Sequence, residues 1–359
     1  MVRARFLDFG TTDALTSQAC YHGLARAMAP EDDPLLDVVR PAEQYVCIGA
    51  HQELEKEVDV AFAESAGLSL YRRHVGGGTV LLDDGQLFWH FVLPKESVAQ
   101  GAVDDLFERF TRPAIDAYRA LGIDAQYAPV NDIVANGKKI GGTGAGQIGD
   151  ATVVVGSFML EFDVETMAEV VTAPSEKFAD KMFETLQANM TTIKQELGEV
   201  PPEAEIIGAF REAIEDRLDW DLRDDDPTPA EEAAIDAARE ELEDEAWLHR
   251  KGLSAGREGT KIKEGTHVGE GRHKAEGGLL RATVVAADGT LSDLVLSGDV
   301  QVLPESGLAD LAADLTGQPL EAAAIRAAAA DSIDERSIQL PGVSPDDVAT
   351  AVMAGVGGS

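Results

Sequence analysis

Hydrophobic residues along this chain follow two spacings, one helical and one typical of strands. Residues 103–121 carry apolar side chains three or four positions apart, which predicts a helix that buries one face. Shorter apolar runs bounded by glycine, proline or acidic residues predict strands. We expect strands at 35–39, 45–48, 68–73, 79–82, 86–93, 123–128, 131–135 and 152–162, and further helices at 11–29, 54–65, 164–171, 174–184 and 206–218. These elements predict an α+β fold with a mixed β-sheet flanked by helices.

The C-terminal third differs from the rest in composition. Residues 223–229 contain three aspartates and two prolines, as a linker does, and residues 230–249 form an acidic helical stretch. Beyond them, an Asp-Gly turn at Asp288 separates two apolar runs between 277 and 303, and helices are expected at 307–315 and 320–329. We therefore predict a large N-terminal domain (1–222), an acidic helical linker (223–270) and a small α/β C-terminal domain (271–359).

A glycine-rich segment carries the first candidate chemistry. Arg72 and Arg73 end a predicted strand, and three glycines follow at 76–78. Glycines let a ligand approach the backbone closely, and consecutive N–H groups can bind an anion. Arginine is suited to bidentate contacts with phosphate or carboxylate. Taken alone, this segment is better explained as an ordinary glycine-rich surface loop.

A second segment, 131–146, favours the functional interpretation. Asn136-Gly137 predicts a type I′ hairpin turn, and the returning strand carries Lys139 before a run of small residues. A strand with so few side chains is a poor core element, so we expect a ligand to lie over it. The hairpin would place Lys139 across from Asn131 and Asp132.

Together the two segments resemble the signatures of the lipoate–protein ligase family, within the biotin/lipoate ligase group. In this chain they are Arg72-Arg73-His74-Val75-Gly76-Gly77-Gly78 with Asp83, and Asn131-Asp132-Ile133 with Lys139-Ile140-Gly141-Gly142-Thr143. The tail adds a weaker match to the accessory domain of such ligases, at residues 274–281 and 297–299. The resemblance thus covers most of the chain.

The resemblance implies a fold, a reaction and a set of partners. Such enzymes activate lipoate or octanoate with ATP and Mg²⁺ to an acyl-AMP. They then transfer the acyl group to a lysine of a lipoyl carrier domain, either that of a 2-oxoacid dehydrogenase E2 or the glycine cleavage H protein. By the same resemblance Lys139 is the catalytic residue, and the binding residues are Arg72, Arg73, Gly76, Gly77, Gly78, Asp83, Asn131, Asp132, Gly142 and Thr143.

Some positions depart from the family pattern and keep alternatives open. Val75, Leu82, Gly141 and Val155 stand where the family usually has Ser or Thr, His, Ser or Thr, and His, respectively. These departures leave the acyl acid and the adenylation step open. An ATP-independent lipoyl or octanoyl transferase and a non-catalytic binder of lipoyl domains are therefore the alternatives.

The composition of the chain indicates which partners and which cellular environment to expect. The chain has 65 acidic and 30 basic residues, a formal net charge of −35. Such charge opposes nucleic-acid binding and is expected for a salt-rich cytoplasm, because screening reduces self-repulsion. No apolar run approaches the roughly 20 residues that span a bilayer, and no signal-peptide pattern opens the sequence. The histidines and cysteines show no metal-ligand spacing, so we predict no metal site formed by the protein alone.

Overall fold

The computed structural model describes residues 1–95, 103–172, 176–250 and 266–357. The chain divides into two compact units. Unit 1 comprises residues 1–48, 57–74 and 79–248, and unit 2 comprises 49–56, 75–78 and 249–359. The expected α+β fold, a mixed sheet flanked by helices with an additional C-terminal region, is confirmed.

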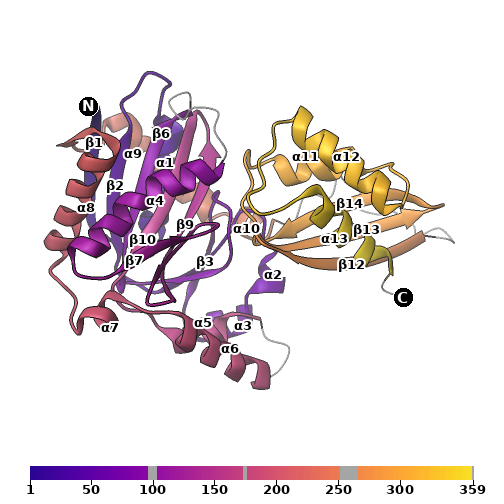
Figure 1. Cartoon of the computed structure of the whole chain (residues 1–359), viewed down its shortest axis with the longest axis horizontal. Helices are drawn as coiled ribbons and strands as arrows, with labels where there is room; N and C mark the ends of the chain where they lie inside the picture. Colours follow the sequence, from indigo (N-terminus) through magenta and orange to yellow (C-terminus); the bar gives the residue numbers. More distant parts are fainter. Residues whose placement is uncertain (96–102, 173–175, 251–265, 358–359) are drawn as a thin grey trace. The chain divides into compact units, whose positions relative to one another are not determined.

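Unit 1 is built on an eight-stranded mixed sheet (Figure 1). In spatial order its strands are β11 (Trp220–Asp224), β1 (Val2–Thr12), β2 (Leu35–Pro41), β6 (Gln86–Pro94), β10 (Ala151–Met159), β9 (Lys138–Ile148), β8 (Asp132–Ala135) and β7 (Ala125–Ala128). Strand β1 pairs parallel with both β11 and β2, and the pairs from β2 to β7 are antiparallel. A smaller sheet has the order β4 (Ser69–Arg72), β3 (Tyr45–Ile48), β5 (Val80–Leu82).

Helices of unit 1 lie on both faces of the large sheet, and some of them pack against the small sheet instead. The helices are α1 (Ala14–Ala27), α3 (Val60–Ser65), α4 (Val103–Ala120), α5 (Val164–Val170), α6 (Glu176–Asn189), α7 (Ile193–Leu197), α8 (Glu203–Leu218), α9 (Pro229–Leu242) and α10 (Glu245–Leu248). Strand β6 is buried along its whole length. Its Phe91 packs against Phe110 of α4 and Phe210 of α8, while Phe88 faces α1 and the small sheet. The alternation follows from the two-residue period of a strand.

Helix α9 lies against α1 as part of unit 1. A Cβ on Gly23 of α1 would lie 2.4 Å from the Ile235 backbone, so glycine permits the close crossing. Arg5 of β1 also binds the Glu231 carboxylate at 2.5 Å. The boundaries predicted at 222 and 270 remain a prediction about independent folding, and residues 251–265 of that linker lie outside the described residues.

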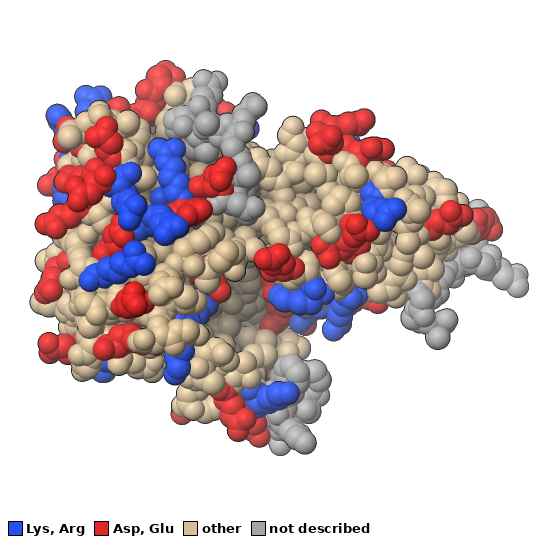
Figure 2. Space-filling view, in the orientation of Figure 1, with Lys and Arg blue, Asp and Glu red and all other residues tan. Residues whose placement is uncertain are grey.

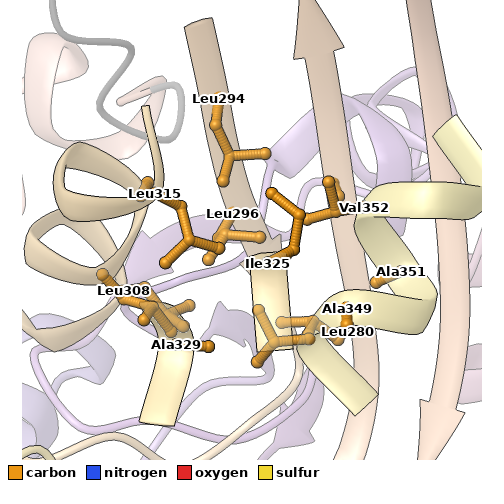
Figure 3. Packing of buried hydrophobic residues seen from close by; sticks show 14 of the residues in the cluster. Leu280, Leu294, Leu296, Leu308, Leu315, Ile325, Ala329, Ala349, Ala351 and Val352 are labelled. Atoms are coloured by element: carbon orange, nitrogen blue, oxygen red, sulfur yellow. The ribbon is translucent and has the colours of Figure 1, made fainter. Parts of the chain in front are cut away.

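Unit 2 contains an antiparallel sheet and three longer helices. These elements are β12 (Thr266–Ala275), β13 (Gly278–Ala287), β14 (Thr290–Gly298), α11 (Gly307–Leu315), α12 (Ala322–Glu335) and α13 (Pro345–Gly357), and the short α2 (Leu54–Glu57) begins in this unit. The helices bury leucine, isoleucine and valine side chains against the sheet (Figure 3). The predicted turn is confirmed, because Asp288 and Gly289 have φ of 51° and 74°.

Several elements differ from the sequence prediction. Strands β1, β11 and β12 and helices α7 and α13 were not predicted, and the helix expected at 54–65 is two helices, α2 and α3. Asp59 divides them, because its carboxylate accepts the Phe62 N–H and so begins a new helix. No helix in the described ranges is both long and apolar enough to cross a membrane.

Acidic side chains on the face shown in Figure 2 are dispersed and interspersed with basic ones. Even if every basic residue formed an ion pair, the excess of acidic residues would leave the formal net charge at −35.

We predict that stability rises steeply with monovalent salt, because screening weakens repulsion among the excess carboxylates. Thermal melts from dilute buffer to about 1 M potassium chloride check this, since the Debye length falls to about 3 Å there. An unchanged melting temperature across the series would contradict the charge argument.

We also predict that residues 1–248 fold cooperatively, whereas residues 1–222 are markedly less stable. The shorter fragment lacks α9 and therefore exposes the α1 surface beside Gly23. Circular-dichroism melts of the two fragments check this, and equal melting temperatures would mean that α9 contributes nothing to unit 1.

Candidate active site

Strand β4 and the residues after it position the arginine pair. Strands β4 and β3 are parallel, with Arg72 opposite Ile48. The Arg73 N–H donates to the Ile48 carbonyl at 3.0 Å, and its guanidinium donates to the Cys47 carbonyl at 3.2 Å. Arg72 is 1% exposed and Arg73 is 9% exposed. The parallel pairing therefore continues one residue past the strand and determines where Arg73 lies.

Arg72 makes extensive contacts with main-chain oxygens. Its Nε donates to the Trp247 carbonyl at 2.9 Å, and its Nη2 donates to the Leu248 carbonyl at 2.9 Å. These contacts indicate a structural role for Arg72 in this conformation. The ligand-binding role of both arginines remains a prediction.

The glycine loop belongs to unit 2 and is closely packed there. A Cβ on Gly76 would lie 2.8 Å from Gln301 Oε1 and 2.9 Å from the Val300 carbonyl. Gly77 has φ of 97°, and its N–H donates to the Val300 carbonyl over a long 3.4 Å. A Cβ on Gly78 would meet Asp299 only at an ordinary 3.6 Å. Close approach and a positive φ thus account for two of the three glycines, and anion binding by the loop stays a prediction.

The predicted hairpin brings five of the proposed site residues together in unit 1. Asn136 and Gly137 have φ of 51° and 76°, as a type I′ turn requires. The Lys139 Nζ lies 2.7 Å from Asp132 Oδ1, and the two side chains are 42% and 37% exposed. Asp132 pairs with Gly142, where an added Cβ would lie 3.0 Å from Lys139 Nζ. The lysine therefore extends over a glycine, beside a carboxylate.

Asn131 and Thr143 fasten the base of this hairpin. The Thr143 N–H and hydroxyl both donate to the Asn131 carbonyl, at 2.9 and 3.0 Å, and the Asn131 amide donates to the Thr143 carbonyl. Their polar groups are engaged with each other, so they hold Asp132 in register with Gly142.

Asp83 lies on a different segment, in the turn after β5. Its carboxylate accepts the Gly85 N–H at 2.9 Å and the Gln44 side-chain amide at 3.3 Å. Burial raises the pKa of Asp83, against the effect of these hydrogen bonds. The geometry indicates a carboxylate that closes the turn, and its binding role remains a prediction.

Sequence reasoning missed a polar network behind the arginine pair. The His74 N–H donates to His22 Nε2 at 3.1 Å, and His22 Nδ1 lies 2.5 Å from the Gln18 carbonyl. His22 is therefore a neutral acceptor, with its proton on Nδ1. Burial keeps the pKa of His22 well below its usual range, and neighbouring His74 lowers it further. His22 and His74 are 52 positions apart, and no local pattern in the sequence indicates that they are in contact.

A buried cluster of Cys20, Asp37 and His90 lies on the α1 face of the sheet. Their potential ligand atoms lie within 4.8 Å of one another, the one such group in the described residues. His90 Nδ1 is 2.6 Å from Asp37 Oδ1, however, and the Cys20 thiol donates to the same oxygen. Two ligands of a tetrahedral zinc ion stand about 3.3 Å apart, given bond lengths of about 2.0 Å. The cluster therefore fits a hydrogen-bonded network better than a metal site.

The fold and the hairpin define the class of protein. The family model for the lipoyl protein ligase A/B catalytic domain matches residues 13–215. The chain therefore belongs to that family.

Curated relatives include both ligases and transferases. Lipoate-protein ligase A subunit 1 of Thermoplasma acidophilum is 26% identical over 60% of this chain and 84% of its own length. Lipoate-protein ligase LplJ of Bacillus subtilis is 26% identical, but the chain spans about half of that relative, 48%. Octanoyltransferase LipM of Halalkalibacterium halodurans is 24% identical over 69% of this chain and 99% of its own length.

Solved structures share the fold. A bipartite lipoate protein ligase from Thermoplasma acidophilum has a TM-score of 0.65, 24% identity and coverage of 73% of this chain and all of its own. LipL1 of P. falciparum, solved with lipoate, has a TM-score of 0.67 at 14% identity and covers 93% of this chain and 98% of its own. At these identities the similarity establishes the fold.

We predict that stability falls as the pH drops below about 6.5. An unfolded histidine titrates near 6.5, whereas folded His22 has a lowered pKa, so the unfolded state binds the proton first. His22→Gln keeps an acceptor but does not titrate. Denaturant unfolding between pH 5 and 7 should show a weaker pH dependence for this variant. Equal slopes for the two proteins would remove His22 from the explanation.

Proposed function

We propose that this protein activates lipoate or octanoate with ATP and Mg²⁺ and transfers the acyl group to a lysine of a lipoyl carrier domain. The observation that carries the proposal is the Lys139–Asp132 pair over Gly142, in a chain of the lipoyl ligase family. A relative solved as lipoate-protein ligase A bound with ATP, and another with bound lipoic acid, support these substrates.

The proposed chemistry has two steps. A carboxylate oxygen of the acid attacks the α-phosphorus of ATP and expels pyrophosphate. The neutral amine of the carrier lysine then attacks the acyl carbon, AMP leaves, and the amine loses a proton. The first step brings two anionic groups together, and the second develops negative charge on the acyl oxygen and on the departing AMP phosphate. Lys139 and Arg73 would stabilise this charge on oxygen in both steps.

Lys139 is well suited to exchange partners. An ion pair between half-exposed side chains is worth only about 0–1 kcal/mol. The Lys139 ammonium can therefore leave Asp132 for a phosphate or acyl oxygen at little cost. Mg²⁺ would be held chiefly by the ATP phosphates, as it usually is in nucleotide enzymes. Asp132 would remain beside the lysine and keep it on the hairpin surface.

The cysteines favour the ligase over a thiol-dependent transferase. Cys20 and Cys47 are fully buried, and burial raises the pKa of both thiols. A nucleophilic cysteine needs an accessible thiolate, so neither residue suits an acyl-thioester intermediate. The similarity to octanoyltransferases nevertheless makes ATP-independent transfer between carriers the second candidate.

The proposal also includes the protein that accepts the acyl group, the role of the C-terminal residues and the cellular environment. One structural relative is described together with its E2 lipoyl domain, which supports an E2 domain as acceptor, and the H protein is the other candidate. That relative is bipartite, and we propose that residues 271–359 supply an accessory domain here on the same chain. The dispersed negative charge favours a salt-rich cytoplasm.

We predict that Lys139→Ala lowers acyl transfer by about 100-fold or more, the scale for losing one electrostatic stabiliser. Mass spectrometry of a lipoyl domain incubated with enzyme, ATP, Mg²⁺ and lipoate measures the transfer.

Lys138→Ala is the matched control. Lys138 is the preceding residue of the strand, so its side chain points to the opposite face. Transfer by a folded Lys139→Ala protein within about threefold of wild type would refute the assignment.

A further inference from the structure

The segment that carries Arg73 is held by a helix from outside the matched family region. Trp247 of α10 donates its indole N–H to the Arg72 carbonyl at 2.8 Å. In return the Arg72 side chain donates to the Trp247 and Leu248 carbonyls, both at 2.9 Å. The family match ends at residue 215, so the family signature does not include this reciprocal contact.

The same tryptophan also holds the residue on the other side of Arg73. Its ring stacks on the His74 imidazole, with centroids 4.2 Å apart and planes 18° from parallel. His74 Nε2 lies 3.1 Å from Glu241 Oε1 of α9, and Glu241 also pairs with Arg26. The hydrogen bond with His74 is the main reason why the pKa of Glu241 falls to about 2. Glu241 is thus charged at neutral pH and anchors His74.

We propose that Trp247 is a positioning residue of the ligase site, which acts by fixing Arg72 and His74 on either side of Arg73. This inference rests on the function proposed above. The indole thus holds both neighbours of Arg73 and adds to the contacts that Arg73 itself makes with the Ile48 and Cys47 carbonyls. Without the indole, the guanidinium of Arg73 would be less precisely placed. A misplacement of about 1 Å at a charge-stabilising group can cost about 100-fold in rate. Trp247 itself does not touch the substrate in this scheme.

Two substitutions of Trp247 distinguish its hydrogen bond to Arg72 from its stacking on His74. Trp247→Phe keeps an aromatic ring over His74 but removes the donor to Arg72, whereas Trp247→Ala removes both. Trp89→Phe is the matched control, because the Trp89 indole N–H is buried and has no hydrogen-bond partner. This control measures how activity and stability respond when a smaller phenyl ring replaces an indole in unit 1 and no hydrogen bond is lost.

The first measurement is lipoate-dependent pyrophosphate release in the full-length protein. We expect kcat/KM to fall about 10-fold or more for Trp247→Ala, to an intermediate degree for Trp247→Phe, and less than about twofold for Trp89→Phe. The melting temperature of Trp247→Phe should stay at or above that of Trp89→Phe, so lost stability cannot account for the difference. Unchanged kcat/KM in folded Trp247 variants would overturn the proposal.

The second measurement does not depend on activity. Hydrogen exchange of residues 71–76 should accelerate most in Trp247→Ala, because His74 loses the ring that stacks on it. The acceleration should be smaller in Trp247→Phe, which loses only the donor to the Arg72 carbonyl, and β6 should be unchanged. If wild type releases no pyrophosphate, the proposed function fails, and exchange still reports on the positioning. Unaltered protection of residues 71–76 would overturn the inference. If Trp247→Ala does not fold, Trp247→Phe carries both measurements.

Discussion

Strand β6 is buried on both faces, and the other elements of unit 1 must pack so as to cover it. All nine residues are buried, with Phe91 toward α4 and α8 and with Phe88 and His90 toward α1. A strand in that position leaves no space for a ligand along its length. The residues proposed to bind substrate therefore lie on segments beyond this strand, including the end of β4 and the β8–β9 hairpin.

These two segments are fixed by backbone contacts. At the hairpin, a type I′ turn and the Asn131–Thr143 hydrogen bonds determine the register that brings Lys139 beside Asp132. At the end of β4, strand pairing, His22 and Trp247 determine where Arg73 lies. Contacts to main-chain groups therefore set the positions of both segments, and the Arg72 side chain makes several of these contacts itself.

Local signals in the sequence predicted much of this arrangement. Asn136-Gly137 and Asp288-Gly289 identified two hairpins, and the apolar spacing of 103–121 identified α4. Strand β1 was missed because the alternation of Arg3 and Arg5 with the buried Ala4 and Phe6 spans only a few residues. The Trp247 contacts join residues about 175 positions apart, and no local pattern encodes such a pairing. Long-range contacts of this kind had to come from the structure.

ATP use is the central claim, because it separates a ligase from a carrier-to-carrier transferase within one family. The most direct measurement is exchange of labelled pyrophosphate into ATP by the full-length protein in about 1 M potassium chloride, where charge repulsion is screened. We predict exchange that requires lipoate or octanoate and Mg²⁺. Acyl transfer between carrier domains that proceeds without ATP, in a protein that shows no exchange, would contradict it.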